Sequence, residues 1–514
     1  MDSPQKPRIC ISVCEPTVDR LEHAIPAAAE VCDLIEVRLD CLDPQELKTG
    51  ASLITRLLEK SACKSILTFR PTEQGGQRQL DAETRREFWS GAIFSESFFD
   101  VELDLAEQVN ATESSPPLPI DWSRTICSQH DFAGVPANLE QVYDRLACTP
   151  ARILKIAVQA DDVTDCLPLF RLLERARSEG REMIAIAMGT AGIVTRILGP
   201  SRGAFLTYAS LESGSATAPG QITAHDLKDV YRLENIDRQT QIFGLIGMPV
   251  SHSISPWLHN AAFATVGKNA VFIPFEVHDV KAFMKRMVNP RTRELDWNVR
   301  GLSVTAPHKS TVMEQLDWLE PAAKEIGAVN TIVIEDEALH GFNTDARGFI
   351  TPLAKESGDL RAACCAVIGA GGAAKAAVWA LKQAGAQVTI FARDTAKGSS
   401  PAERFGAVSL PLKEATFEGF DVVINATPLG TAGRLNDETP ATRHQLRGAR
   451  LAYDLVYNPT ETRFLREARA AGCKTLGGLA MLVAQAAEQF RLWTGAAAPE
   501  DVLQEAAQRG LKTR

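Results

Sequence analysis

The sequence predicts an α/β protein with an N-terminal (β/α)8 barrel, followed by a second α/β part that contains a Rossmann-like nucleotide-binding unit. Two observations carry this prediction. Eight short β-type runs alternate with helical stretches between residue 8 and about residue 210, which is the rhythm and length of eight βα units. Further along, residues 364–393 are typical of a strand, a glycine turn, a helix and a second strand.

The eight runs are expected to form the strands of the barrel. They are RICISV, LIEVRLD, SILTFR, FFDVELD, RTICSQHD, ARILKIAV, EMIAIAM and FLTYAS, in chain order. Two of them alternate apolar and charged residues. Glu36 and Arg38 lie on the charged face of LIEVRLD, and Asp100 and Glu102 lie on the charged face of FFDVELD. Because the apolar face of a barrel strand meets the helices, we expect the charged faces to point inward. Unpaired charge is costly there and must be networked or functional.

Length and composition exclude several classes of protein. At 514 residues the chain is too long for one core, and its 45% hydrophobic and 23% charged residues indicate neither disorder nor a fibre. The net charge of -9 comes without long like-charge blocks, which argues against nucleic acid and anionic membranes and favours small-molecule partners. The longest apolar window, residues 364–386, is interrupted by lysines and glycines and does not predict a membrane span.

The eleven cysteines form neither a disulfide framework nor a Cys-x-x-Cys pair, so a reducing compartment is expected. A strand-like run begins at Arg8, which leaves little room for a targeting peptide, and we expect a cytoplasmic protein. The adjacent Cys364 and Cys365 begin an apolar strand, where packing in the core is expected. The sequence does not predict the oligomeric state.

Three domains are expected. Residues 1–235 would form the barrel, because a helical stretch at 225–233 is followed by a fresh strand from about residue 241. Residues 241–345 would form a second α/β domain, completed by C-terminal helices within 478–514 that fold back onto it. Residues 346–477 would form the nucleotide-binding domain.

One lysine stands in an apolar strand. Lys155 lies within ILKIAV, where burial would favour its uncharged amine, a nucleophile toward ketones. The positive charges of Arg38 and Arg70 would favour the uncharged form further. Taken alone, the lysine is more typical of a side chain that reaches from a strand end into solvent. A lone histidine such as His130 is likewise more often a packing residue than a base.

Six motifs in this part of the chain carry a family resemblance. They are EVRLD (36–40), TFRPTEQGG (68–76), SQHDF (128–132), KIA (155–157), MGTAGIVTR (188–196) and SATAPGQ (215–221). Together they resemble the type I 3-dehydroquinate dehydratases over about 215 residues. The resemblance implies that Lys155 forms an imine with the ring ketone, and that His130 removes the adjacent proton and later helps hydroxide leave.

The same resemblance assigns the remaining residues of the first site. Arg196 would bind the carboxylate of the substrate. The other residues implied around the substrate are Ser12, Glu36, Arg38, Arg70, Met188, Thr217 and Gln221. Gln74 stands where many relatives have Glu, which leaves open whether a carboxylate supports His130.

A second group of polar residues follows the barrel. Ser253 and Ser255 occupy alternate positions of an extended stretch, so both hydroxyls can face one ligand, although Ser255 before a proline is also typical of a helix start. Lys309 lies where a strand gives way to a helix, and Asp345 ends the run GFNTD. Singly, each of these two is more typical of a solvated charge than of a catalyst.

As a set, the later motifs resemble shikimate dehydrogenase across residues 241–495. They are GMPVSHSISPWLHN, SVTAPHKS, GAVNT, GFNTD, INATPLG, YDLVYNP and GGLAMLVAQAAEQF. The resemblance implies a catalytic pair, Lys309 and Asp345, that polarises a ketone and delivers a proton as hydride arrives. The residues implied around the substrate are Ser253, Ser255, Thr305, Asn330, Tyr457 and Gln485. Ser303 replaces a frequent Asn, a change expected to leave the fold intact.

The nucleotide-binding unit is expected to take NADP. Its glycine run, residues 369–374, follows a strand and opens a helix, a context in which backbone N–H groups bind phosphates. Arg393 and Lys397 suit a 2′-phosphate, whereas Asp394 between them would suit the ribose hydroxyls of NAD. The expected cofactor contacts are Gly369, Ala370, Gly371, Gly372, Ala373, Arg393, Lys397, Thr427, Val456, Gly478 and Met481. No metal is expected.

The two resemblances describe consecutive steps, so the sequence predicts a bifunctional shikimate-pathway enzyme. Its first part would dehydrate 3-dehydroquinate to 3-dehydroshikimate, and its second part would reduce that product to shikimate with NADPH. One alternative is a Schiff-base aldolase-like barrel joined to a quinate dehydrogenase, against which Ser253 and His130 argue. Another is a non-catalytic sensor, which should have lost at least one of Lys155, His130, Lys309 and Asp345; all four are present.

Overall fold

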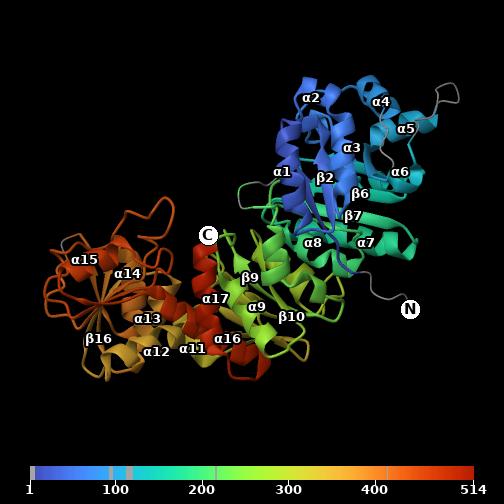
Figure 1. Ribbon diagram of the computed structural model, residues 1–514. Coiled ribbons are helices and arrows are strands. Elements are labelled where there is room, and N and C mark those ends of the chain that lie inside the picture. The colour runs from blue at the N-terminus through green and yellow to red at the C-terminus, as the bar shows by residue number, and fades with distance from the viewer. Residues whose placement is uncertain are drawn as a thin grey trace. The chain divides into compact units, whose positions relative to one another are not determined.

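The computed structural model describes residues 6–91, 96–111, 120–212, 214, 217–413 and 415–513. The chain divides into two units. The first is made of the residues up to Thr240 together with Ile273–Met287 and Thr292–Asn298. The second is made of Gln241–Phe272, Val288–Arg291 and Val299–Arg514. Figure 1 colours both units along the chain.

The first unit contains an eight-stranded parallel barrel, as predicted. The strands are β1 (Ile9–Val13), β2 (Leu34–Arg38), β3 (Lys64–Thr68), β4 (Phe98–Glu102), β5 (Thr125–Asp131), β6 (Ile153–Gln159), β7 (Glu182–Met188) and β8 (Thr207–Ala209). Their order in the sheet is β7-β6-β5-β4-β3-β2-β1-β8. Between β7 and β8 the sheet is joined by a bridge from Met183 to Ala204 and a 2.8 Å hydrogen bond from the Phe205 N–H to the Met183 carbonyl. The barrel is therefore nearly closed.

Helices surround the strands of this barrel (Figure 1). They are α1 (Val18–Ala29), α2 (Pro44–Thr49), α3 (Ala51–Lys60), α4 (Ala82–Gly91), α5 (Leu103–Ala111), α6 (Leu139–Ala147), α7 (Leu167–Ser178) and α8 (Ile193–Leu198). In α1 the buried residues Leu21, Ile25 and Ala28 recur every three to four positions, the spacing of a helix with one apolar face. The stretch predicted as helical at 225–233 contains a π-helix, Asp226–Val230, and is followed by a short 3-10 turn, Leu233–Asn235.

The charged faces of β2 and β4 point into the barrel, as the alternation predicts. Glu36, Arg38, Asp100 and Glu102 are all buried, at no more than 6% exposure. The intervening residues of β2 and β4 are apolar and also buried, because the helices cover that side. Burial of four charges in one strand layer requires compensation, which the interior supplies as ion pairs.

The chain from Gln241 onward contains two six-stranded sheets. One has the order β10-β9-β11-β13-β14-β12 and the other β17-β16-β15-β18-β19-β20. The strands of the first are β9 (Gln241–Gly247), β10 (Ala270–Glu276), β11 (Val299–Val304), β12 (Trp318–Leu319), β13 (Thr331–Glu335) and β14 (Ala338–Phe342). Those of the second are β15 (Cys364–Ile368), β16 (Gln387–Ala392), β17 (Val408–Pro411), β18 (Val422–Asn425), β19 (Leu451–Asp454) and β20 (Lys474–Leu476).

The second of these sheets has the predicted nucleotide-binding topology. All its neighbouring strands run parallel, and β15, the helix α13 (Gly372–Gln383) and β16 form the expected strand, turn, helix and strand. Cys365 is fully buried in its core beside Val367, as expected for a packing residue. Between Gln241 and Gly477 the other α-helices are α9 (Ser255–Thr265), α10 (Val280–Phe283), α11 (Pro321–Ile326), α12 (Thr344–Ser357), α14 (Thr395–Phe405) and α15 (Arg463–Ala470).

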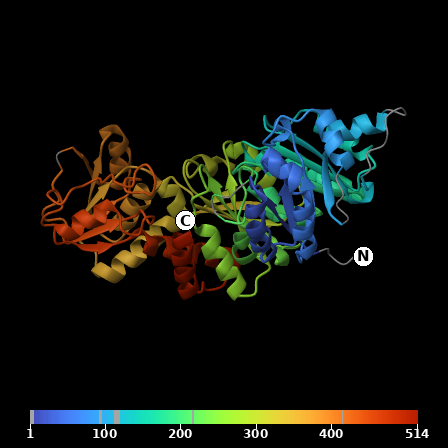
Figure 2. The ribbon, with the colours of Figure 1, turned by 45° about the horizontal axis from the view of Figure 1, so that its top comes forward.

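Two C-terminal helices pack against earlier elements of the second unit. The helix α16 (Gly478–Thr494) lies along α12, and α17 (Glu500–Thr513) lies along α9, where Figure 2 shows the red end of the chain beside a green helix. A Cβ atom added at Gly348 of α12 would lie 2.6 Å from the Cβ of Gln485 on α16, so the two helices touch at their backbones. No helix in the described ranges is long and apolar enough to cross a membrane.

An aromatic cluster in the second unit encloses a histidine. His259 of α9 is fully buried, stacks on Phe272 with ring centroids 4.4 Å apart, and lies 5.1 Å from the ring of Trp493. Burial in these surroundings lowers the pKa of His259 to about 3. The folded protein therefore holds this imidazole uncharged, whereas the unfolded chain protonates it near the ordinary histidine pKa.

We predict that the second unit loses stability as pH falls because of His259. Between the ordinary pKa and the lowered one, the unfolded chain binds a proton that the folded unit does not, so the free energy of unfolding decreases toward acid. From about pH 7.5 to about pH 5 the loss from this group is about 2 kcal/mol. Hydrogen exchange of α9 amides, corrected for intrinsic rates, measures it.

The variant His259→Leu should remove this part of the pH dependence, and His444→Leu, at an exposed histidine of the same unit, should keep it. An equal acid-induced loss of protection in wild type and His259→Leu would contradict the prediction.

Candidate active sites

A cavity near the carboxyl ends of the barrel strands, here called the barrel site, brings together every residue predicted for the first site. Ser12, Glu36, Arg38, Arg70, His130, Lys155, Met188, Arg196, Thr217 and Gln221 all line it. The carboxyl ends of the strands are the catalytic face of a (β/α)8 barrel, so this placement is that of an active site. The cavity is also lined by Gln74, Gly75, Phe132, Ala157, Ile186, Tyr208 and Ala218, which the motifs did not assign to the site.

Lys155 is held by acceptors from three other strands. Its Nζ lies 2.7 Å from Asp100 Oδ2, 2.9 Å from the Tyr208 hydroxyl and 3.6 Å from Glu36 Oε1. The expectation that burial and neighbouring arginines favour the uncharged amine took no account of Asp100. The Nζ group donates a hydrogen bond to that carboxylate, and a proton must leave Nζ before the amine can attack a carbonyl.

Asp100 belongs to a row of alternating charges. Arg70 lies 2.6 Å from Asp100 and 3.5 Å from Glu102, and Arg85 lies 3.1 Å from Glu102 and 2.5 Å from the half-exposed Asp104. Burial would raise the pKa of Asp100, but Arg70 and Lys155 outweigh it and hold that pKa below its ordinary value. At Glu102 burial dominates and raises the pKa to about 7. Asp100 is therefore the reliably charged partner of Lys155.

His130, at the end of β5, contacts Gln74 at two points. The side-chain oxygen Oε1 of Gln74 lies 2.7 Å from the His130 backbone N–H, which donates to it, and 3.3 Å from Nδ1 of the ring. A neutral amide thus occupies the place beside His130 where relatives were expected to have a carboxylate. Burial lowers the pKa of His130 well below its ordinary value, and the charges of Arg70 and Lys155 add to this effect. The imidazole is uncharged and able to accept a proton.

Arg196 on α8 is a buried cation that pairs with no carboxylate among the described residues. Its guanidinium donates weakly to the carbonyls of Tyr208, at 3.4 Å, and Pro219, at 3.3 Å, while Nε has no hydrogen-bond partner in the described part of the chain. Burial lowers its pKa to about 10. A buried guanidinium with free donor capacity is suited to a carboxylate ligand.

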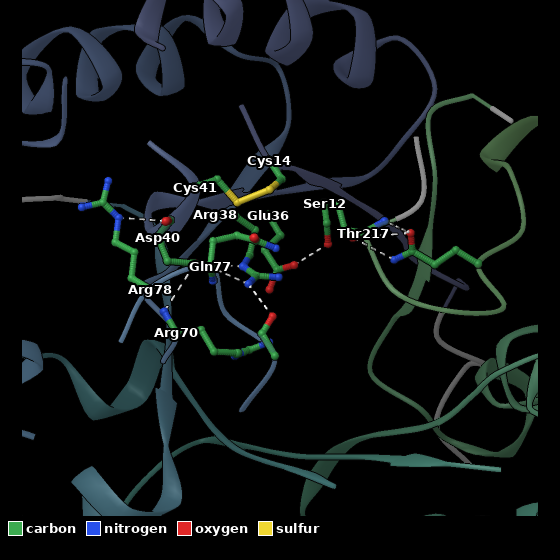
Figure 3. Close-up of a disulfide and its surroundings, with 12 residues drawn as sticks. Ser12, Cys14, Glu36, Arg38, Asp40, Cys41, Arg70, Gln77, Arg78 and Thr217 are labelled. Atoms are coloured by element: carbon green, nitrogen blue, oxygen red, sulfur yellow. Dashed lines mark hydrogen bonds and ion pairs between the residues drawn. A yellow bond between two sulfur atoms is a disulfide. The ribbon is translucent and has the colours of Figure 1, made fainter. Parts of the chain in front are cut away.

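A disulfide joins two loops at the rim of the barrel site (Figure 3). It connects Cys14, which follows β1, to Cys41 in the 3-10 turn after β2. Beside it, Arg38 donates to Asp40 at 2.9 Å and to the Gly75 carbonyl at 3.0 Å. The sequence analysis did not predict this bond, because two cysteines 27 residues apart show no recognisable spacing.

The second site is centred on Lys309 and Asp345, which the structure brings into contact. Lys309 Nζ lies 2.5 Å from Asp345 Oδ2, and the Asn330 amide donates to the other carboxylate oxygen at 2.8 Å. Asn330 also accepts the backbone N–H of Thr344 at 2.7 Å, which fixes the first turn of α12. The Asp345 carboxylate is buried and oriented, and its contact with Lys309 holds the tip of that side chain close to α12.

The other residues predicted for the second site lie on several elements of the second unit. Ser253 donates to the Ser255 hydroxyl at 3.0 Å, and Ser255 is the first residue of α9, so the paired hydroxyls and the helix start coexist. Thr305 follows β11, Tyr457 follows β19, and Gln485 lies on α16. The sequence analysis missed Gln489, whose amide donates to Ser303 at 3.0 Å and to the Asn330 carbonyl at 3.2 Å.

The glycine turn before α13 fits a dinucleotide phosphate. Gly369 has a φ of +121°, and a Cβ atom there would lie 2.9 Å from the Ala426 carbonyl oxygen, so only glycine fits. The helix starts at Gly372 after Gly371, whose position provides no side-chain cap, so its first N–H groups can face an anion. A Cβ atom at Gly372 would lie 3.3 Å from Lys309 Cδ, so the turn adjoins the second site.

The residues expected at the 2′-phosphate lie at the start of α14. Arg393 is exposed just after β16, and the side chain of Lys397 lies outside the described residues. Asp394 accepts a hydrogen bond from the Ala396 N–H at 3.1 Å and so caps the start of α14. This capping role is an alternative to binding the ribose hydroxyls of NAD. Of the other expected contacts, Thr427 donates to Asn425 at 2.7 Å, Val456 donates to Asp454 at 3.0 Å, and Gly478 and Met481 lie on α16.

Family models match nearly the whole chain. Residues 9–238 match a model described as type I 3-dehydroquinase, and residues 245–332 match the shikimate dehydrogenase substrate binding domain. Residues 352–451 match shikimate / quinate 5-dehydrogenase, and residues 478–508 match the shikimate 5'-dehydrogenase C-terminal domain.

Known proteins are similar to nearly the whole chain or to about half of it. The chain is 34% identical to the bifunctional 3-dehydroquinate dehydratase/shikimate dehydrogenase, chloroplastic, of Arabidopsis thaliana, over 96% of this chain and 83% of that protein. It is 43% identical to the shikimate dehydrogenase (NADP(+)) of Oleidesulfovibrio alaskensis, over 50% of this chain and 91% of that protein. A crystal structure of a shikimate dehydrogenase in complex with NADP+ aligns with a TM-score of 0.50 at 36% identity, over 54% of this chain and 97% of that one.

We predict that the Cys14–Cys41 disulfide stabilises the barrel. It closes a loop with a sequence separation of 27, for which the chain-entropy model gives about 3.5 kcal/mol. The variant Cys14→Ser should lower the free energy of unfolding by this order, measured by urea unfolding with pulsed hydrogen exchange of the β1 and β2 peptides. Cys148→Ser, at an exposed free cysteine, should have no effect. Coincident unfolding of wild type and Cys14→Ser without reductant would disprove the contribution.

Proposed function

Because the chain belongs to the family of bifunctional 3-dehydroquinate dehydratases/shikimate dehydrogenases, we propose that its two sites catalyse consecutive reactions. The barrel site dehydrates 3-dehydroquinate to 3-dehydroshikimate, and the second site reduces 3-dehydroshikimate to shikimate with NADPH. The observation that carries the proposal is that each site holds a lysine in contact with a carboxylate, Lys155 with Asp100 and Lys309 with Asp345.

In the first reaction Lys155 is the nucleophile. Once Nζ has lost a proton, its lone pair attacks the ring ketone, and loss of water gives an imine that draws electrons from the adjacent carbon. His130 is uncharged and lines the same cavity, so it takes the proton from that carbon and then returns a proton to the leaving hydroxide. Hydrolysis of the imine regenerates Lys155 and releases the product.

Arg196 supplies the charge that orients the substrate. Its buried guanidinium has free donor capacity and takes the ring carboxylate. The hydroxyl groups of the substrate are bound by the polar residues that line the same cavity: Ser12, Glu36, Arg38, Arg70, Thr217 and Gln221. Met188 closes the site with an apolar side chain.

In the second reaction Lys309 is the acid. Its ammonium, held by Asp345, polarises the ketone of 3-dehydroshikimate and gives a proton to the alkoxide oxygen. Asn330 fixes Asp345, so the position of the proton donor is set by α12. The substrate is placed by Ser253, Ser255, Thr305, Tyr457 and Gln485.

The cofactor is NADP, which supplies the hydride when bound. The backbone of Gly369–Gly372 and the start of α13 would hold its pyrophosphate, and Arg393 with Lys397 would hold the 2′-phosphate. The contact between Gly372 and Lys309 puts the phosphate turn next to the proton donor. Ala370, Ala373, Thr427, Val456, Gly478 and Met481 complete the proposed cofactor contacts.

The proposed domain limits follow the sequence analysis: 1–235 for the dehydratase, 241–345 with 478–514 for the substrate domain, and 346–477 for the NADP domain. The start of β9 at Gln241 supports the first boundary, and the packing of α17 on α9 supports joining the C-terminal helices to the substrate domain. Two segments inside that domain, Ile273–Met287 and Thr292–Asn298, group with the barrel unit instead. Nine free cysteines among the described residues support a cytoplasmic location, whereas the Cys14–Cys41 disulfide argues against a reducing compartment. The Arabidopsis relative is described as chloroplastic, so the family is not confined to one compartment.

We predict that two variants separate the two activities. With 3-dehydroquinate and NADPH, the wild type should produce shikimate. Lys155→Ala should lower dehydration by about 1000-fold or more, because the nucleophile is lost, and Asp345→Asn should lower reduction by about 100-fold. Absorbance of the enone product and oxidation of NADPH measure the two steps.

Each variant is the control for the other, since Lys155→Ala should still reduce 3-dehydroshikimate and Asp345→Asn should still dehydrate. Borohydride added during turnover should attach the substrate to Lys155, detected as a mass increase on its peptide. Continued dehydration by Lys155→Ala would rule out the imine.

A further inference from the structure

Tyr208 contacts Lys155 in the barrel site, and none of the sequence motifs assigned a role to this tyrosine. It lies on β8, the strand beside β1, and is buried at 5% exposure. Its hydroxyl is 2.9 Å from Lys155 Nζ, which donates to it, and 3.5 Å from Glu36 Oε1, to which it donates. Its ring centroid lies 4.5 Å from the same Nζ. The residue therefore touches the reactive nitrogen with both its ring and its hydroxyl.

The hydroxyl is one of three acceptors placed around Nζ. The others are carboxylate oxygens of Asp100, at 2.7 Å, and Glu36, at 3.6 Å. An ammonium group has three N–H donors, and the number of these oxygens equals it: two accept hydrogen bonds and the third, on Glu36, forms an ion pair at 3.6 Å. A lysine side chain is a flexible four-carbon stem, and burial of the stem alone does not fix the direction of its tip. The direction is set by these three contacts.

We propose that Tyr208 is a positioning residue for Lys155, whose hydroxyl fixes the direction in which the amine lone pair points during attack on the ketone. The proposal rests on the imine role of Lys155 given above. After one proton has left Nζ, two N–H groups remain, and they keep the two shorter contacts, to Asp100 and Tyr208. The lone pair then occupies the third tetrahedral direction, on the side of Glu36, which lines the cavity, so the proposal puts the ketone carbon on that side of Nζ.

A neutral group suits this task better than a third carboxylate. Burial and the nearby charge of Glu36 raise the pKa of Tyr208 well above its ordinary value, so the hydroxyl stays protonated and adds no charge beside Asp100 and Glu36. The hydroxyl accepts a hydrogen bond from Lys155 and donates one to Glu36, so it acts as both acceptor and donor. Phenylalanine would keep the ring under Nζ and lose only this link.

The test is Tyr208→Phe in the full chain. In a rapid-mixing experiment with 3-dehydroquinate and borohydride, the rate of formation of the Lys155 adduct should fall about 10-fold, as expected for loss of one hydrogen bond to a charged group. The kcat for dehydration should fall with it, while KM should change less than about 2-fold. Reduction of 3-dehydroshikimate by the same molecules should be unchanged, which shows that the preparation is intact.

The matched control is Tyr143→Phe. Tyr143 is a buried tyrosine of the same barrel on α6, and its hydroxyl donates to Glu179 at 2.6 Å instead of to the cavity. Its adduct formation should equal that of the wild type. An unchanged adduct rate in Tyr208→Phe, or a rise in KM with unchanged kcat, would overturn the positioning role. Absence of a borohydride adduct in the wild type would instead overturn the proposed imine itself.

Discussion

An ammonium group removed from water must meet a negative charge, and this requirement organises both sites of the protein. In the barrel the carboxylate of Asp100 meets Lys155, and in the second unit the carboxylate of Asp345 meets Lys309. Each carboxylate is itself held by a further donor, Ser128 in the first case and Asn330 in the second. The two lysines do different chemistry, because one must give up its proton to become a nucleophile and the other must keep its proton until it is transferred.

The surroundings explain that difference. The barrel site contains an uncharged histidine and three cations, Arg38, Arg70 and Arg196, beside the carboxylates of Glu36 and Asp100 that contact Lys155. Around Lys309 the described contacts are Asp345 and the glycine turn, with no comparable group of arginines among the residues placed there by the motifs. In the barrel site a histidine lines the same cavity and can take a proton, as imine chemistry requires. In the second site the lysine adjoins the turn proposed to bind the cofactor, as proton donation during hydride transfer requires.

The sequence predicted the strands well because their signals are local. The alternation in LIEVRLD and FFDVELD indicated both the strand and the face that points inward, and the glycine run indicated the helix start. Contacts between side chains on strands far apart in the sequence depend on how those strands align in the sheet, and they gave no such local signal. Asp100 was placed on the inner face, yet its contact with Lys155 joins residues 55 positions apart. Tyr208 looked like an aromatic strand residue, and Cys14 and Cys41 shared no recognisable spacing.

The close contact at Gly348 has a consequence for inherited variation in this protein. A missense change there would alter no residue that touches substrate or cofactor, and Gly348 itself sits in mid-helix, where alanine is normally the better helix former. Yet the added carbon would fall 2.6 Å from Gln485 Cβ and 2.9 Å from its backbone nitrogen, forcing apart the helices that carry Asp345 and Gln485. A substitution at a position that touches neither substrate nor cofactor would thus disturb the reductase half of the protein by displacing these two helices.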